Sequence, residues 1–178
     1  MRLASPPSLA GHPYSLRPIA PDDVDAWYGY LSLPEVIEHT SWSLTGPDDL
    51  ARIVDACESE RDDTTARFAI VDDSDGSLAG TIALLQIVWR FRTAELAYDL
   101  DPRHSGRGLA TACARAVTDW MLDANDFVRI EATTLDTNRA SRRVLEKVGY
   151  VHEGLMKNKK VVRGVPRDFH LFAKTRTA

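Results

Sequence analysis

The segment 103–108 combines residue types that bind phosphate. It reads Arg-His-Ser-Gly-Arg-Gly and follows a predicted strand that ends at Leu100-Asp101-Pro102. Glycine lets phosphate oxygens approach the backbone closely, and the two arginines add positive charge that can pair with phosphate. If a helix begins at Gly108, its first N–H groups lack intrahelical partners and its dipole attracts an anion. The segment therefore predicts a phosphate-binding loop, although short glycine-containing sequences of this kind also occur in ordinary strand-to-helix connections.

The spacing of the glycines narrows the class of phosphate ligand. The loop fits neither Gly-x-x-x-x-Gly-Lys-Ser/Thr nor Gly-x-Gly-x-x-Gly, which argues against a nucleotide triphosphatase and a dinucleotide enzyme. It fits Arg/Gln-x-x-Gly-x-Gly/Ala, and in this respect the sequence resembles the GNAT superfamily of N-acetyltransferases. Further blocks resemble its RimJ/RimL-like branch, the ribosomal-protein N-terminal acetyltransferases and their relatives, at 95–102, Asn138-x-x-Ser141 and 145–150. The resemblance covers nearly all of the chain after residue 13.

This resemblance implies a fold, a cosubstrate and a set of contacts. The expected fold is the α/β GNAT fold, a single mixed sheet of about seven strands flanked by helices, with splayed fourth and fifth strands. Acetyl-CoA is the expected cosubstrate, with its pantetheine arm between these strands and its pyrophosphate on the loop. Backbone N–H groups near Asp99 and Leu100 would polarise the thioester carbonyl. The other coenzyme contacts are expected at Arg103, His104, Ser105, Gly106, Arg107, Gly108, Ala110, Thr111 and Asn138.

Asn138 and Ser141 lie three residues apart at the start of a predicted helix, so both can reach the same ligand. The resemblance assigns pantetheine binding to Asn138 and protonation of the departing thiolate to Ser141, with Tyr150 or a water molecule as the alternative donor. Asn and Ser are also common helix-capping residues. The capping role and the functional role are compatible, and the spacing alone does not separate them.

Glu95 is the candidate general base. It lies in a strand that is expected to face the acceptor, and strand alternation places Asp99 on the same face. An ordinary solvated or ion-paired strand residue is an equal interpretation of Glu95. A terminal α-amine, with a pKa of about 7.7–8.0, needs little help to become neutral, whereas a lysine amine requires about 4 kcal/mol at neutral pH. A site without a strong base would therefore favour α-amines.

Aromatic residues precede the phosphate loop. Trp27 and Tyr28 have helical spacing and are expected in the core, whereas Tyr30 is a weaker candidate for the acceptor mouth. Trp42 follows no such period and is the aromatic residue that we expect to bind the acceptor.

The apolar periodicity supplies the elements that must position these residues. Strands are predicted at 14–18, 67–71, 78–84, 94–100, 129–135, around 150–156 and around 168–173. Helices are predicted from Pro21, from Pro47, over 108–122 and over 138–148, with Gly149 in left-handed geometry after the last one. A mobile leader or a surface arm is expected over residues 1–12, and a single domain over 13–178.

Composition excludes several kinds of partner. The chain has 178 residues, of which 44% are hydrophobic, and a net charge of −4. This charge gives no global basic field for nucleic acid. No apolar run has the length of a signal peptide or a membrane span, so we expect a cytoplasmic protein. We also expect a monomer or a homodimer. The two cysteines are expected to be reduced core residues, and the scattered histidines predict no metal site.

Three functions remain open. The leading one is acetyl transfer to a protein N-terminal α-amine. The second is the same chemistry on a small amine such as an amino acid, a polyamine or an aminoglycoside, and acidic residues near the expected entrance, Asp22, Asp23, Asp25 and Glu35, suit a polycation. The third is a non-catalytic coenzyme A-binding module.

Overall fold

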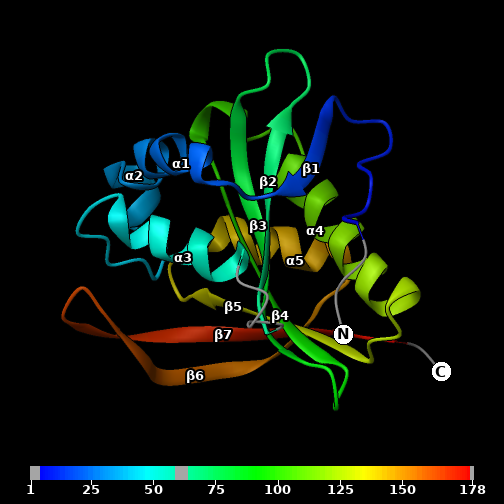
Figure 1. Ribbon diagram of the computed structural model, residues 1–178. Helices are drawn as coiled ribbons and strands as arrows, with labels where there is room; N and C mark the ends of the chain where they lie inside the picture. The colour runs from blue at the N-terminus through cyan, green and yellow to red at the C-terminus, as the bar shows by residue number, and fades with distance from the viewer. Residues whose placement is uncertain (1–4, 59–63, 177–178) are drawn as a thin grey trace.

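A computed structural model describes residues 5–58 and 64–176 and contains one seven-stranded sheet (Figure 1). The strand order across the sheet is β1-β2-β3-β4-β5-β7-β6. The strands are β1 (Tyr14–Pro18), β2 (Ala66–Asp72), β3 (Leu78–Val88), β4 (Thr93–Leu100), β5 (Arg129–Leu135), β6 (Val151–Val162) and β7 (Val165–Thr175). The helices are α1 (Val24–Leu31), α2 (Pro34–Ile37), α3 (Asp48–Glu58), α4 (Leu109–Asp119) and α5 (Arg139–Val148).

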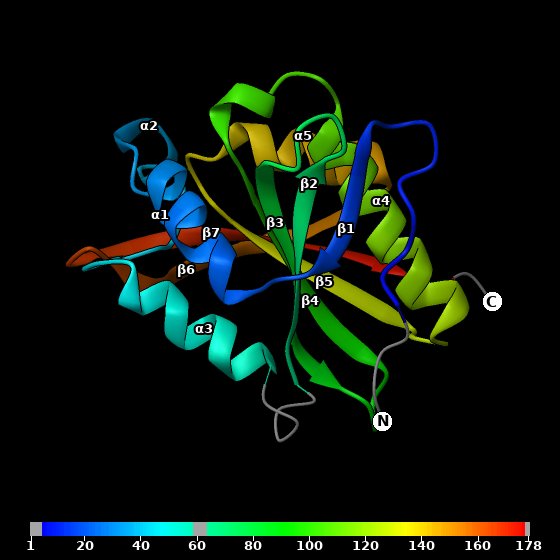
Figure 2. The same ribbon diagram turned by 45° about the horizontal axis from the view of Figure 1, so that its top comes forward.

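Helices cover both faces of this sheet. Figures 1 and 2 show α1 and α3 on one side and α4 and α5 on the other. Two apolar clusters follow this division, because the side chains of each strand alternate between the faces. The cluster beneath α1 and α3 includes Trp27, Leu50 and Ala69. The larger cluster lies beneath α4 and α5.

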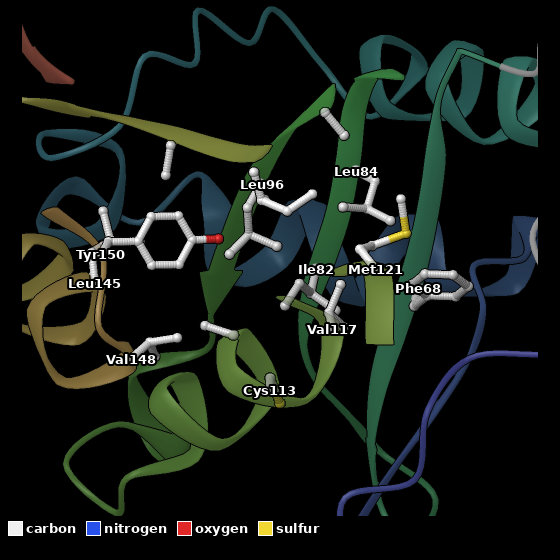
Figure 3. Close-up of a cluster of buried hydrophobic side chains, with 14 of the residues drawn as sticks. Phe68, Ile82, Leu84, Leu96, Cys113, Val117, Met121, Leu145, Val148 and Tyr150 are labelled. Atoms are coloured by element: carbon white, nitrogen blue, oxygen red, sulfur yellow. The ribbon is translucent and has the colours of Figure 1, made fainter. Parts of the chain in front are cut away.

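The larger cluster shows how helical and strand periods meet. Leu109, Cys113 and Val117 recur every fourth residue of α4 and are buried. Figure 3 shows side chains of α4 facing Ile82 and Leu84 of β3 and Leu96 of β4. Cys113 is buried and Cys57 is half-buried, and neither forms a disulfide. Burial raises the pKa of the Cys113 thiol to about 12, which keeps it protonated.

The sheet opens between its fourth and fifth strands. The parallel pairing of β4 with β5 joins Thr93 to Arg129 and ends where Glu95 meets Glu131. Both strands continue beyond this point, β4 to Leu100 and β5 to Leu135. The two strands therefore diverge and leave backbone groups of both unpaired, which confirms the splay that the sequence led us to expect.

The predicted elements are confirmed, with differences at the edges. Strand β6 extends to Val162 and β7 begins at Val165, so both are longer than their apolar cores indicated. They are longer because they form one hairpin. The short helix α2 was not expected, and α4 continues as a π-helical turn at Trp120–Ala124. Ahead of β1, Leu9 is 6% exposed and belongs to the larger cluster, so the described part of the expected leader lies against the domain.

Candidate active site

The loop between β4 and α4 presents free backbone donors. Gly106 and Gly108 have φ of +78° and +80°, a conformation that favours glycine. The backbone N–H groups of Gly106, Arg107 and Gly108 donate to no residue in the described part of the chain. The first turn of α4, which begins at Leu109, adds N–H groups without intrahelical partners. The loop therefore has the geometry of an anion site.

The side chains of this loop divide into two groups. The guanidinium of Arg103 turns back on Asp101, with Nη2 2.6 Å from Oδ2. His104 Nδ1 lies 3.1 Å from the hydroxyl of Tyr14, so this ring packs toward β1. Arg107 is exposed beside the two glycines. Of the charged loop residues named from the sequence, Arg107 is the one with its charge uncommitted.

A hollow adjoins this loop on α4. Gly108, Thr111 and Arg115 form one side of it, Lys147 of α5 contributes to its wall, and the segment from Ser8 to His12 completes it. The volume is about 500 Å³. The surface that continues from the anion loop thus carries two basic side chains.

A second pocket of about 210 Å³ lies at the splay of β4 and β5. It is lined by β4 and β5, by the start of α5 and by the segment between α2 and α3. The lining residues are His39, Thr40, Ser41, Trp42, Arg67, Leu85, Leu96, Ala97, Tyr98, Asp99, Ala132, Thr133, Thr134, Leu135, Asn138, Ser141 and Phe169. Trp42, Asp99, Asn138 and Ser141, which were named from the sequence, are therefore brought together in one pocket.

Ser141 has a proton-bearing partner that the sequence did not indicate. Its hydroxyl lies 2.9 Å from the hydroxyl of Tyr98, which projects from β4 on the α5 side. Burial raises the pKa of Tyr98 to about 12, so the phenol stays protonated at neutral pH. The pair can donate a proton into the pocket. Tyr150, the alternative donor, is bonded instead to Thr118 over 2.8 Å and is buried.

Asn138 caps α5 as the spacing allowed. Its Oδ1 accepts from the N–H of Ser141 over 2.9 Å, and its Nδ2 donates to the carbonyl of His39 over 2.9 Å. An amide oxygen has two lone pairs and an amide nitrogen has two hydrogens, so one acceptor and one donor position are still available. The capping role is observed, and binding of pantetheine stays a prediction.

Asp99 contributes a buried carboxylate to the pocket. Its Oδ1 accepts from Trp27 Nε1 over 3.1 Å, from the Tyr30 hydroxyl over 2.5 Å and from the Thr81 hydroxyl over 3.1 Å. Burial raises the pKa of Asp99, and the nearby positive charge of Arg67 offsets part of this rise. Tyr30 is therefore a buried partner of Asp99, and the prediction that it lines the acceptor mouth is wrong.

The backbone of Asp99 does not face the splay. A Cβ added to Gly80 of β3 would lie 2.5 Å from the carbonyl oxygen of Asp99, so this peptide group faces β3. Peptide groups alternate in direction along a strand, which turns the N–H groups of Tyr98 and Leu100 toward β5. Of the two residues expected to polarise the thioester carbonyl, Leu100 directs its N–H toward β5, as this role requires. The N–H of Asp99 does not point there, and Asp99 contributes its side chain to the pocket instead.

Glu95 lies beside the pocket without lining it. Its carboxylate accepts from the Thr133 hydroxyl over 2.7 Å and from Gln86 Nε2 over 3.2 Å. It shares a strand face with Asp99, as alternation predicted, and reaches the pocket only through Thr133. Asp99 is thus the one carboxylate among the lining residues.

The acidic residues expected at the entrance lie elsewhere. Asp22 and Asp25 line a separate hollow between α1 and α3. Asp23 pairs with Arg17, with Nη2 2.7 Å from Oδ1. Glu35 is exposed on α2 and does not line the pocket. None of these four residues lines the pocket at the splay, so the expected acidic entrance is not found there.

Besides Tyr98, sequence reasoning missed Arg67 and Thr134 in this pocket. Arg67 of β2 is 5% exposed, and its guanidinium carbon lies 4.8 Å from the ring centre of Trp27 and 5.9 Å from that of Trp42. Two side-chain atoms in the described residues are buried without a hydrogen bond, Arg67 Nε and Thr134 Oγ1, and both residues line this pocket. For Arg67, the available signal in the sequence was an arginine at the start of an apolar strand.

Residues 5–58 and 64–176 contain no group of three or more His, Cys, Asp or Glu residues that could hold a metal ion. No helix in this part of the chain is long and apolar enough to span a membrane.

A glycine anion loop after the fourth strand and a pocket between splayed strands together define an acyltransferase that uses coenzyme A thioesters. Residues 15–151 match the family model described as Acetyltransferase (GNAT) domain, and the chain belongs to this family of enzymes, which use acetyl-CoA. The expected GNAT fold is thereby confirmed, and the chain is an acyltransferase rather than a non-catalytic module.

Individual relatives agree with this assignment. Probable N-acetyltransferase YjcK of Bacillus subtilis (strain 168) is 36% identical over 123 residues, 68% of this chain and 68% of that protein. The structure of ribosomal-protein-S5-alanine acetyltransferase from Vibrio fischeri has a TM-score of 0.80 and 23% identity, over 93% of this chain and 94% of that one. The structure of spermidine N-acetyltransferase from Vibrio cholerae in complex with CoA and spermine has a TM-score of 0.81 and 18% identity, over 92% and 96%.

Proposed function

We propose that this protein transfers the acetyl group of acetyl-CoA to the α-amine of a protein N-terminus, in the cytoplasm, as a member of the RimJ/RimL-like branch. The observation that carries this proposal is the pocket at the splay, which contains a proton donor and a single carboxylate, that of Asp99, buried and hydrogen-bonded to Trp27, Tyr30 and Thr81. The second candidate function is the same acetyl transfer to a small-molecule amine, such as an amino acid, a polyamine or an aminoglycoside.

The coenzyme is assigned to two surfaces. Its pyrophosphate accepts hydrogen bonds from the N–H groups of Gly106 to Thr111, beside the charge of Arg107. Its pantetheine arm enters the splay, where Asn138 has one donor and one acceptor position available. The N–H of Leu100 lies on the β5 side and polarises the thioester carbonyl. Arg103 and His104 shape the loop through Asp101 and Tyr14.

The reaction requires one bond to form and one to break. The neutral amine attacks the thioester carbon, the C–N bond forms and the oxyanion is stabilised at the N–H of Leu100. Collapse of this intermediate breaks the C–S bond, and Ser141 donates its proton to the thiolate while Tyr98 replaces it. The amine loses its proton to water, either directly or through Thr133 and Glu95, and water returns a proton to Tyr98, so that every group ends in its starting state.

The state of the carboxylates supports an α-amine acceptor. Asp99 accepts three hydrogen bonds at one oxygen, and Glu95 is held by Thr133 and Gln86. A lysine would have to lose its proton to one of these hydrogen-bonded carboxylates, at a cost of about 4 kcal/mol at neutral pH, whereas an α-amine is already substantially neutral. A polyamine is less well served, because the pocket contains a single carboxylate and a buried arginine.

Coenzyme binding and acceptor choice can be tested together. Acetyl-CoA is expected to raise Tm while ATP and NAD do not, because only a ligand of the native state stabilises it. In Gly108→Glu, a side chain and a negative charge occupy the phosphate position, so the shift should disappear. A panel of peptides, amino acids, polyamines and aminoglycosides then identifies the acceptor. Equal stabilisation by all three nucleotides, or turnover of polyamines alone, would contradict the proposal.

A further inference from the structure

Arg67 brings a positive charge to the pocket at the splay, and most of its N–H groups are unpaired. Its side chain is 4% exposed. A guanidinium has five N–H donors, and Nη1 of Arg67 donates to the Thr81 hydroxyl over 2.7 Å. Nε is buried without a partner, and Nη2 donates to no residue within 5–58 or 64–176. A buried cation in this state is unfavourable unless a further group compensates it.

Asp99 compensates the charge of Arg67 but does not pair its N–H groups. The closest approach between the two groups is 3.9 Å, from Nη1 to Oδ2, which is too long for a hydrogen bond. The Oδ1 atom of Asp99 already accepts from Trp27, Tyr30 and Thr81. The ring of Trp27 lies beneath the guanidinium and attracts its charge, but an aromatic face leaves the N–H groups of the fork unpaired.

The unpaired edge of Arg67 matches one chemical group. Nε and Nη2 lie on the same edge of the planar guanidinium, and this edge accepts a carboxylate through two parallel hydrogen bonds. Nη1, on the other edge, is the nitrogen held by Thr81. Trp42 lies beside the same guanidinium and lines the pocket, so an anion at this edge would contact the segment expected to bind the acceptor.

We infer that the acceptor carries a carboxylate near its amine and that Arg67 binds this carboxylate. The inference rests on the proposed acetyl transfer to an amine and specifies its acceptor. Two sources share the required chemistry. One is a peptide whose first residue is Asp or Glu, and the other is a free amino acid with its α-carboxylate.

Matched acceptors separate carboxylate recognition from amine recognition. One pair is a peptide that begins with Glu and the same peptide beginning with Gln, and the other is methionine and methioninamide. Spermidine completes the set. In at least one pair, kcat/KM of the carboxylate member should exceed that of the amide by about 10- to 100-fold, the range of a hydrogen-bonded charge pair. The pair that shows the preference identifies the source.

Variants of Arg67 test whether this residue is responsible. Arg67→Met should abolish the preference, and Arg67→Lys, which keeps a positive charge opposite Asp99 but lacks the fork, should reduce it about tenfold. Both should act on the ratio of the carboxylate rate to the amide rate, and the coenzyme KM should not change. Arg17→Lys is the control, because Arg17 pairs with Asp23 and does not line the pocket. If Arg67→Met fails to fold, Arg67→Lys carries the test.

The outcomes are distinguishable from failure of the proposed function. Equal rates within each pair, or Arg67 variants that slow both members alike, would overturn the inference while acetyl transfer stands. If no amine is acetylated, the proposed function fails, and calorimetry with CoA bound decides the inference separately. Tighter binding of a carboxylate member that is lost in Arg67→Met would support it, and equal binding of both members would overturn it.

Discussion

At the scale of single residues, the proposed chemistry depends on two hydroxyl groups that come from different elements. Ser141 at the start of α5 and Tyr98 of β4 lie within hydrogen-bond distance, 2.9 Å apart. Ser141 lines the pocket and is placed to protonate the thiolate, while Tyr98 is placed to restore its proton. The pair is therefore expected to behave as one unit in kinetic measurements.

Ser141→Ala is expected to lower kcat by about 10- to 100-fold and to leave the coenzyme KM nearly unchanged. The loss is moderate because a free thiol has a pKa of about 8.5 and leaves without strong acid assistance. Tyr98→Phe should lower kcat less, by about three- to tenfold. The double variant should be no slower than Ser141→Ala, because both changes interrupt one proton path. Full kcat with a lower Tm in Ser141→Ala would mean that this serine only supports the helix.

The raised pKa of Tyr98, about 12, predicts the pH dependence. The phenol donates only while it is protonated, and the protonated form persists well above pH 10. We therefore expect kcat/KM to rise from pH 6 as the acceptor amine loses its proton, then to remain level to about pH 10. Initial rates across this range check the expectation. A fall below pH 10 that disappears in Tyr98→Phe would show that the phenol ionises earlier.

At the scale of elements, β3 and β4 approach each other closely at Gly80. The contact lies beside Asp99 and Leu100, the two β4 residues that are proposed to face the acceptor and the thioester. A side chain at this glycine would meet backbone atoms, which cannot move as a flexible side chain can. The position of β4 at the pocket therefore depends on the absence of a Cβ in β3.

Gly80→Ala is expected to lower both stability and activity. The new Cβ would lie 2.5 Å from the Asp99 carbonyl oxygen and 2.5 Å from Leu100 Cδ2, so the strands must separate. The cost should be about 1–3 kcal/mol of unfolding free energy, with a lower kcat. Gly29→Ala is the matched control, since this exposed α1 position has open space and should gain about 0.5–1 kcal/mol. Thermal unfolding of both variants gives the comparison, and an unchanged Tm for Gly80→Ala would contradict the close approach.

At the scale of the whole molecule, the pocket is closed by segments that are distant in the chain. Arg163, in the turn of the β6–β7 hairpin, donates to the carbonyl of Trp42 over 2.5 Å and to that of Thr40 over 3.2 Å. Asn138 donates to the carbonyl of His39 from the other side. The segment that carries Trp42 is thus held between the hairpin and α5.

Arg163→Ala should weaken acceptor binding without affecting the coenzyme. Loss of these carbonyl contacts frees the 39–42 segment, and we expect the acceptor KM to rise about three- to tenfold. The coenzyme KM should not change, because the contacts of Arg163 are with the carbonyls of Glu38, Thr40 and Trp42 and not with the anion loop. Lys159→Ala on the same hairpin is the control, since this side chain is exposed. If Arg163→Ala raised the coenzyme KM equally, the hairpin would support the whole fold rather than this segment.

The amino-acid sequence by itself determined the local features of this protein. Glycine spacing defined the anion loop, and Gly106 and Gly108 adopt the positive φ that such a loop requires. Apolar periods located the seven strands and the main helices, and Gly149 ends α5 with φ of +95°. These features depend on neighbouring residues, so a single segment contains the information needed to predict them.

Only the tertiary structure decided which distant residues meet. Tyr98 reaches Ser141 across 43 residues, and Arg163 reaches Trp42 across 121. Apolar patterns indicate that a strand face is covered, but the sheet order decides which element covers it. In this sheet, for example, β7 lies between β5 and β6. For the same reason the sequence did not reveal the pairing of Arg67 with Thr81, or that Asp22 and Asp25 lie away from the pocket. Each depends on the helix or strand that packs opposite, which local periodicity does not specify.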